Sequence, residues 1–180
     1  MKILVFTEGT ILTHESWVGL PREEIVRQVK TVFSFPREEL EKILKSGSVP
    51  WLGDYAGSVP NRNCLKKIGN WKRQGATIMY LTSRRTSEQI QIIRDVLKKY
   101  GFPEGDLLFC SGNEEYKDVA ERVMPDIIVE DDCESIGGEK EMTYPRIRPE
   151  LKQRIKSIVV KEFGGIDHLP DSITELLKYQ

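Results

Sequence analysis

The sequence lacks the features that mark secreted, membrane-bound and nucleic-acid-binding proteins. Its three cysteines, Cys64, Cys110 and Cys133, are far apart and odd in number, so they predict neither a disulfide framework nor a CxxC metal site. No apolar run approaches the roughly 20 residues that span a bilayer, and the first residues show no secretory signal pattern. The formal net charge of −1 gives no attraction to nucleic acid or anionic lipid. We therefore expect a cytoplasmic protein with no nucleic-acid or membrane partner.

The chain is long enough for one globular unit with a regular architecture. Its 180 residues can form one hydrophobic core, or a core with a small inserted subdomain. From residue 61 onward, short apolar runs alternate with helical patterns. Together with a first strand at 3–6, we expect strands at 76–81, 107–110, 127–130 and 155–160, and helices at 62–74, 87–100, 114–123 and 171–179. This alternation predicts an α/β fold with a parallel sheet and helices on both faces.

Residues 13–60 interrupt this pattern between the first strand and the repeating part. Two amphipathic helices, each opening with a proline, are expected there, followed by a glycine- and proline-rich loop over residues 45–62. Right-handed crossovers place the C-terminal ends of all parallel strands on one edge of the sheet, where such folds have their sites. We interpret residues 13–60 as a small helical cap over that edge, with residues 1–12 and 61–180 as the core domain.

Carboxylates gather at the ends of two predicted strands. Glu8 follows the first apolar run, and Asp131 and Asp132 follow the run at 127–130. The parallel topology brings these strand ends to one edge of the sheet. Carboxylate oxygens are the ligands that Mg²⁺ takes in proteins. The sequence therefore predicts a metal site formed by Glu8, Asp131 and Asp132.

Four short motifs, in this order, resemble those of the haloacid dehalogenase (HAD) superfamily. Residues 6–10 read Phe-Thr-Glu-Gly-Thr, where the family has Asp-x-Asp-Gly-Thr after its first strand. Thr82 resembles the second motif, a Thr or Ser that ends the next strand, and Lys117 resembles the third, a lysine before the fourth strand. The acidic pair Asp131-Asp132 is similar to the fourth motif. The resemblance implies a three-layer, Rossmann-like core with strand order 5-4-1-2-3 and a small helical cap after the first strand.

The resemblance also implies roles for these residues. Glu8 stands at the position of the acid/base, which protonates the leaving group and then activates water. The Thr82 hydroxyl and the Lys117 ammonium would bind oxygens of the transferring phosphoryl group. Glu8, Asp131 and Asp132 would hold Mg²⁺, and the ligand would be a small phosphorylated molecule or phosphate. Lys117 lies on a charged helix, where a solvated lysine is nearly as good an interpretation.

One position departs from the family pattern. The first Asp of the family attacks phosphorus and forms an aspartyl-phosphate, but Phe6 stands at its place and can neither attack phosphorus nor bind Mg²⁺. In other alignments Thr7 replaces the nucleophile, or Glu8 is the nucleophile and Thr10 takes the acid/base position. Loss of one member of a catalytic unit typically costs several orders of magnitude in rate. His14, shortly after this motif, is a further candidate for an acid or base.

Three functions are left open by the sequence. The first is a divergent HAD-like hydrolase-fold protein that binds a small phosphorylated compound with Mg²⁺, its covalent phosphatase activity lost or altered. The second is a non-catalytic binding or regulatory protein on the same scaffold, with a protein partner. The third is a hydrolase in which water attacks directly with Glu8 as the base, or in which Glu8 or Thr7 replaces the nucleophile. The sequence names neither the substrate nor the oligomeric state.

Overall fold

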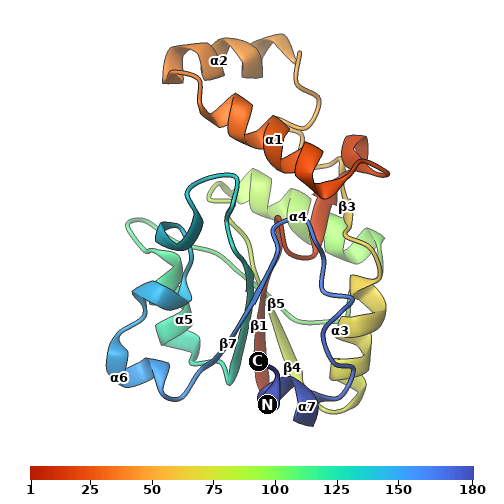
Figure 1. The fold of residues 1–180 in the computed structure, drawn as a ribbon, viewed down its shortest axis with the longest axis vertical. Helices are drawn as coiled ribbons and strands as arrows, with labels where there is room; N and C mark the ends of the chain where they lie inside the picture. The colour runs from red at the N-terminus through yellow and green to blue at the C-terminus, as the bar shows by residue number, and fades with distance from the viewer.

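The centre of the molecule is a five-stranded parallel sheet, in a computed structural model that describes residues 1–180 (Figure 1). Its strands are β1 (Lys2–Phe6), β4 (Thr77–Leu81), β5 (Asp106–Leu108), β6 (Ile127–Asp131) and β7 (Lys156–Val160). Ile3, Leu4 and Val5 are fully buried, as the continuous apolar run of a strand covered on both faces requires. The predicted α/β fold with a parallel sheet is confirmed.

The strands lie side by side in the order β5-β4-β1-β6-β7. The labels differ from the predicted order 5-4-1-2-3 because the chain has two further short strands that were not predicted, β2 (Leu12–His14) and β3 (Ser58–Pro60). When the five parallel strands alone are counted along the chain, the observed order reads 3-2-1-4-5, so each strand has the neighbours that were expected. The central strand β1 therefore ends between the ends of β4 and β6.

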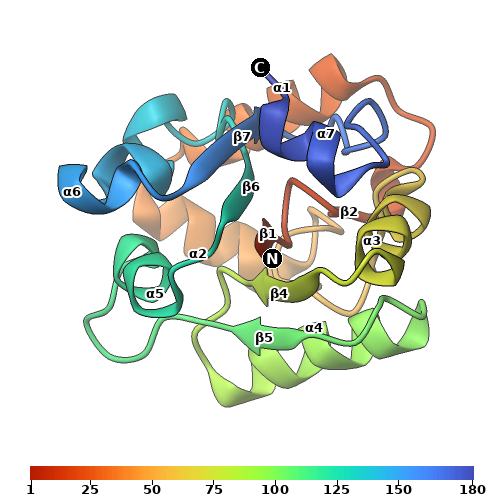
Figure 2. The ribbon, with the colours of Figure 1, turned by 90° about the horizontal axis from the view of Figure 1, so that it is seen from below.

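Helices cover both faces of the sheet and complete three layers (Figure 2). On one face pack α3 (Cys64–Arg73), α4 (Ser87–Lys99) and α7 (Ile173–Lys178), and on the other α5 (Tyr116–Val123) and the short α6 (Pro149–Lys152). Ile3 and Val5 point to the first face and Leu4 to the second, which follows from the two-residue period of a strand. None of these helices, nor any other in the structure, is long and apolar enough to span a bilayer.

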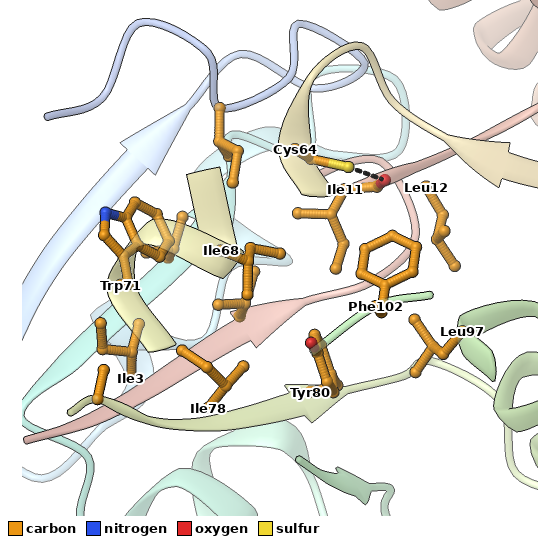
Figure 3. Close-up of a cluster of buried hydrophobic side chains, with 14 of the residues drawn as sticks. Ile3, Ile11, Leu12, Cys64, Ile68, Trp71, Ile78, Tyr80, Leu97 and Phe102 are labelled. Carbon is orange, nitrogen blue, oxygen red and sulfur yellow. Dashed lines mark hydrogen bonds between the residues drawn. The ribbon is translucent and has the colours of Figure 1, made fainter. Parts of the chain in front are cut away.

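The larger core lies between the sheet, α3 and α4, and it also holds the turn after β1 (Figure 3). The Trp71 indole donates a hydrogen bond to the Pro170 carbonyl at 2.9 Å, so this large buried ring has its polar atom satisfied. The Cys64 thiol donates to the Ile11 carbonyl at 3.3 Å, and burial raises its pKa to about 12. Cys64 is therefore a packing residue with no thiolate chemistry at neutral pH.

Residues 13–60 leave and re-enter the core through β2 and β3, which pair antiparallel. β3 lies within the stretch that was expected to be loop throughout, where its three residues give too short a pattern to recognise. Between the two strands stand a 3₁₀ helix (Glu15–Trp17), α1 (Arg22–Phe33) and α2 (Arg37–Ser46). Figure 1 shows α1 and α2 beyond the end of the sheet that is opposite to the two chain termini, on the side where the parallel strands end.

The two helices of this insertion are attached unequally. Ile25 and Val29 of α1 pack on Trp17, with Trp51 and Phe163 against the same cluster. In contrast, α2 has no buried residue. The insertion thus occupies the predicted place over the sheet edge, and its division from the core as a separate cap stays a prediction.

Candidate functional site

A tight turn after β1 carries the first polar residues of the candidate site. The Thr7 carbonyl accepts hydrogen bonds from the amides of Ile11 and Leu12 at 3.0 and 2.9 Å, so the chain turns back directly after the strand. Gly9 has a φ of 79°, a left-handed conformation that glycine adopts without a Cβ clash. Within this turn the Glu8 side chain reaches across to the residues that follow β4.

The Glu8 carboxylate is held by three consecutive residues. Its Oε1 accepts a hydrogen bond from the Thr82 hydroxyl at 2.6 Å, and its Oε2 accepts one from the Ser83 amide at 3.0 Å. Arg84 Nε lies 3.5 Å from Oε1. The Arg84 amide donates to the Thr82 oxygen at 3.2 Å, which leaves the hydroxyl proton of Thr82 for Glu8. We call Thr82, Ser83 and Arg84 the donor cradle.

Arg84 connects the donor cradle to the insertion. Its guanidinium carbon lies 4.3 Å from the centre of the Tyr55 ring, a cation–π contact. Tyr55 belongs to the segment that returns from α2 to β3. The cationic group beside Glu8 is therefore held from two sides, by the sheet edge and by the insertion.

The end of β1 offers no carboxylate at the position that the HAD resemblance gives to the nucleophile. The Phe6 ring packs edge-on against the Tyr116 ring of α5, with centroids 5.9 Å apart. Thr7 is fully buried, and its hydroxyl lies 2.7 Å from Glu8 Oε2 and 3.1 Å from the Leu81 carbonyl. Its single proton serves one of these two acceptors. Neither side chain presents a nucleophile to a ligand in this arrangement.

Asp131 ends β6 as a buried carboxylate with 7% of its surface exposed. Its Oδ2 accepts a hydrogen bond from the Thr10 hydroxyl at 2.8 Å, and its Oδ1 accepts one from the Cys133 amide at 3.0 Å. Burial raises the pKa of Asp131 to about 6 in spite of these two bonds. The neighbouring carboxylates of Glu130 and Asp132 add to the rise.

Asp132 is engaged by a different part of the chain. Its Oδ1 accepts a hydrogen bond from the Glu162 amide at 3.0 Å, and its Oδ2 lies 2.9 Å from the Lys161 ammonium. Although partial burial opposes it, these two contacts hold the pKa of Asp132 below its usual value. Asp132 therefore stays ionised and paired with residues just after β7.

The three predicted metal ligands are thus not brought together. Glu8 is held by the donor cradle, Asp131 by Thr10 and Cys133, and Asp132 by residues after β7. In the whole structure, no group of three or more His, Cys, Asp or Glu side chains is arranged to hold a metal ion. Hydrogen-bonded carboxylates can still bind a metal, so it is the absence of a three-ligand cluster that argues against the site. The residues do not fit Mg²⁺ in this arrangement, and the magnesium site stays a prediction.

Lys117, the predicted phosphate-binding lysine, lies in the first turn of α5. Its ammonium is 2.8 Å from Asp118 and 3.4 Å from Glu115, and the hydrogen bond with Asp118 raises its pKa. The structure does not bring it to Glu8 or to the donor cradle, because its partners are its own neighbours in the chain. From α5 it is Tyr116 that reaches the site.

A cavity of about 600 Å³ lies between the sheet edge and the insertion. The core contributes polar groups to its wall, among them Glu8, Ser83 and Arg84 of the site described above. The insertion contributes aromatic rings, of which Trp17 and Trp51 lie 5.0 Å apart between centroids. A cavity of this size, with one polar wall and one aromatic wall, suits a small organic molecule.

Two further buried carboxylates line this cavity and were not predicted as site residues. Glu130 accepts hydrogen bonds from the amides of Thr143 and Tyr144 at 2.7 and 2.9 Å. Glu162 accepts two bonds of 2.6 Å from the amide and hydroxyl of Ser135. Burial raises the pKa of both carboxyls. An acidic residue two positions after a predicted strand was the available signal for Glu162.

His14 lies at the base of the insertion, on β2. Its Nδ1 accepts a hydrogen bond from the Ser16 amide at 3.1 Å, so a neutral ring carries its proton on Nε2. Nε2 faces the Asp54 carboxylate at 3.5 Å. Both partners come from the insertion, so His14 lines the same cavity as Glu8 but is engaged by residues other than the donor cradle.

Comparison with known proteins identifies a fold and no close relative. No family model matches the sequence, and no curated protein matches it. The class C acid phosphatase from Bacillus anthracis, solved with tungstate bound, is similar with a TM-score of 0.51 and 13% identity, over 98% of this chain and 77% of that one. A putative beta-phosphoglucomutase from Thermotoga maritima has a TM-score of 0.47 and 14% identity, over 90% of this chain and 94% of that one, which is too low to support an argument.

The acid phosphatase is a HAD-superfamily protein. The chain therefore has a HAD-like hydrolase fold, as the four sequence motifs implied. At 13% identity the similarity extends to the fold alone, and the roles of individual residues depend on the geometry described above.

Proposed function

We propose that the protein binds a small phosphorylated compound at the C-terminal edge of the sheet and does not process it through an aspartyl-phosphate. The observation that carries this proposal is the end of β1, where the Phe6 ring packs on Tyr116 at the position that the HAD resemblance gives to the nucleophile. A phenyl ring has no lone pair with which to attack phosphorus. The HAD-like fold is kept, and the group that performs its covalent step is replaced.

The donor cradle supports binding of an oxyanion. A hydroxyl, a backbone amide and a guanidinium are the groups that proteins use to bind phosphate oxygens. Ser83 and Arg84 also line the cavity, so a ligand there can reach them. The structurally similar acid phosphatase was solved with tungstate, which is an oxyanion too. The aromatic wall formed with Trp17 and Trp51 would then cover the organic part of the ligand.

Neither replacement nucleophile is well placed. Thr7 has no exposed surface, so its hydroxyl cannot meet a phosphorus atom in the cavity. Both oxygens of Glu8 accept hydrogen bonds from Thr82 and Ser83, which lowers their power to attack or to take a proton from water. Hydrolysis by direct attack of water, with Glu8 as the base, would require these bonds to open.

Two measurements on the wild-type protein test the proposal. The first is a panel of phosphomonoesters with Mg²⁺, with mass spectrometry of acid-quenched samples for a phosphoryl adduct; we expect no turnover and no adduct. The second is calorimetric titration with inorganic phosphate, with and without Mg²⁺; we expect saturable binding that Arg84→Gln abolishes and that Arg85→Gln, a change of the exposed neighbouring arginine, leaves intact.

Each alternative function has its own result in these experiments. A trapped phosphoenzyme would overturn the proposal and establish a replaced nucleophile. Slow turnover without an adduct, lost in Glu8→Gln, would establish direct attack by water. Binding of neither phosphate nor Mg²⁺ would favour an interaction module. A dependence of phosphate binding on Mg²⁺ would show that the carboxylates rearrange to hold the metal after all.

A further inference from the structure

The donor cradle is already filled by a carboxylate of the same chain. The Thr82 hydroxyl, the Ser83 amide and Arg84 Nε lie 2.6, 3.0 and 3.5 Å from the two oxygens of Glu8. The Glu8 side chain is 26% exposed, and it lines the cavity beside Ser83 and Arg84. Its carboxylate therefore occupies the hydrogen-bond donors that a ligand in the cavity would use.

The burial of Thr82 explains why the cradle needs an occupant. Thr82 has no exposed surface while Glu8 covers it, so the Glu8 carboxylate and not water accepts its hydroxyl proton. The Arg84 amide fixes the orientation of this hydroxyl, which has no second acceptor within reach in the structure. A buried donor without an acceptor carries the full cost of its lost hydration. The cradle therefore favours a bound anion, and in the free protein this anion is the Glu8 carboxylate.

We propose, resting on the function proposed above, that Glu8 is an internal ligand of this oxyanion site and that a tetrahedral oxyanion such as phosphate replaces its carboxylate. The exchange keeps every donor satisfied, since the incoming oxyanion accepts the same bonds from Thr82, Ser83 and Arg84. The apparent affinity for the oxyanion is also lower than the intrinsic affinity, because only the molecules in which Glu8 has left the cradle can bind it. Glu8 thus sets the affinity for the ligand without contacting it.

Arg84 connects the site of this exchange with the insertion. Arg84 is shared between the Glu8 carboxylate and the Tyr55 ring, at 3.5 Å and 4.3 Å respectively. A phosphate dianion attracts the guanidinium more strongly than a carboxylate does, so Arg84 moves toward the cradle and its stacking on Tyr55 changes.

The test is calorimetric titration of inorganic phosphate into the full chain and its variants. We expect Glu8→Ala to bind phosphate at least about tenfold more tightly than wild type, the factor that corresponds to 1.4 kcal/mol. The matched control is Glu141→Gln, which removes a carboxylate from the same cavity wall without touching the cradle. Its effect measures the general repulsion between an anion and the acidic wall, and we expect it to stay below about twofold, as for a partly solvated charge.

A second pair of variants separates this inference from the proposed function. Thr82→Val in the Glu8→Ala background removes a donor and should abolish the gain, whereas Thr82→Ser in that background should keep it. Equal phosphate affinity of wild type and Glu8→Ala, with both lost in Arg84→Gln, would overturn the internal-ligand role and keep the proposed function. No phosphate binding by either protein would overturn both. Circular dichroism of each variant confirms that a loss of binding is not a loss of fold.

Discussion

The Glu8 carboxylate and the Thr82 hydroxyl lie 2.6 Å apart and join the ends of the neighbouring strands β1 and β4. Thr82 is fully buried, whereas Glu8 has one side toward the cavity. The short bond runs from a neutral donor to a charged acceptor, the stronger kind of hydrogen bond in proteins. It fixes the Glu8 side chain on the donor cradle rather than in the open cavity.

Thr82→Val should destabilise the protein by about 1–3 kcal/mol, the usual cost when a buried partner of a charged group is lost. The change removes the donor to Glu8 and the acceptor of the Arg84 amide, while it keeps the shape of the side chain. Urea denaturation at neutral pH measures it. Thr82→Ser is the control, because it keeps the hydroxyl, and a loss as large as that of the valine variant would show that the methyl group matters and not the hydrogen bond.

Lys117→Met should leave phosphate binding unchanged. The ammonium is occupied by Asp118 and Glu115 in its own turn of helix, and it has no contact with the donor cradle. Calorimetric titration with phosphate measures this, with Arg84→Gln as the comparison that should lose binding. If the two variants lost binding to the same extent, the lysine would act in the role that the HAD resemblance implies, and α5 would have to move on binding.

Lys117 and Asp132 also show where prediction from the sequence ends. The sheet and its helices followed from the sequence because a strand buried on both faces needs a continuous apolar run, such as Ile3 to Val5, and a helix needs an apolar stripe. The direction of a charged side chain depends on which opposite charge is nearest after folding. Lys117 pairs with Asp118, and Asp132 pairs with Lys161. No local sequence pattern tells whether such a nearby partner or the predicted site will bind the charged side chain.

For the Glu8 site, the nearness of Glu8 and Thr82 was expected, whereas the hydrogen bonds of Glu8 were not. Strand ends of a parallel sheet meet at one edge, which placed Glu8 near Thr82. No pattern in the sequence indicates that the carboxylate binds the donors itself. That outcome depends on the turn at Gly9 and on the distance across the strand ends, both of which are properties of the folded chain. Ser83 enters the site through its backbone amide, for which a sequence carries no signal.

Asp131→Asn should stabilise the protein at neutral pH and not at pH 4. Burial raises the pKa of Asp131 from 3.8 to about 6, so the folded state favours the protonated carboxyl. Below the unfolded pKa both states are protonated and the group contributes nothing; as pH rises through the folded pKa, the cost of the buried charge is reached in full. That cost is about 2–3 kcal/mol. Asparagine avoids it, and it can keep both bonds if the Thr10 hydroxyl accepts from its amide.

Urea denaturation of both proteins from pH 4 to pH 8 measures this difference. The gain of the asparagine variant should grow across the interval between the two pKa values and then remain constant. A stability gain of the same size at all pH values would show that the gain comes from packing and not from the buried charge. The same experiment with Mg²⁺ examines the predicted metal site, since stabilisation of the wild type alone would mean that Asp131 binds the ion.

Arg22→Met should loosen α1 from the core. Arg22 Nε donates to the Glu162 carbonyl at 2.8 Å, and its guanidinium pairs with Glu134, so a helix of the insertion is tied to the segments after β6 and β7. We expect the amides of α1 to exchange at least about tenfold faster, which corresponds to 1.4 kcal/mol of local stability. The control is Arg27→Met, which removes an arginine from the same helix whose partner, Glu24, lies on that helix too. Equal effects of the two variants would mean that Arg22 acts through helix propensity and not through its contacts with the core.

Gly9→Ala should destabilise the protein far more than Gly19→Ala, although both glycines have a left-handed φ, of 79° and 86°. An added Cβ at Gly9 would lie 2.8 Å from Asp131 Oδ2, whereas at Gly19 it would meet nothing within 4 Å. Gly19→Ala therefore measures the conformational penalty alone, about 1–2 kcal/mol. Gly9→Ala adds a clash with a buried carboxylate whose two hydrogen bonds prevent it from moving aside. We expect at least about 2 kcal/mol beyond the control, within the range for overpacked buried sites. Thermal denaturation of the two variants compares their stabilities.

The turn at Gly9 also aims Glu8 at the donor cradle. The folded fraction of Gly9→Ala should therefore bind phosphate with altered affinity, while Gly19→Ala binds as wild type does. Equal binding by both variants would mean that the cradle holds Glu8 independently of this turn.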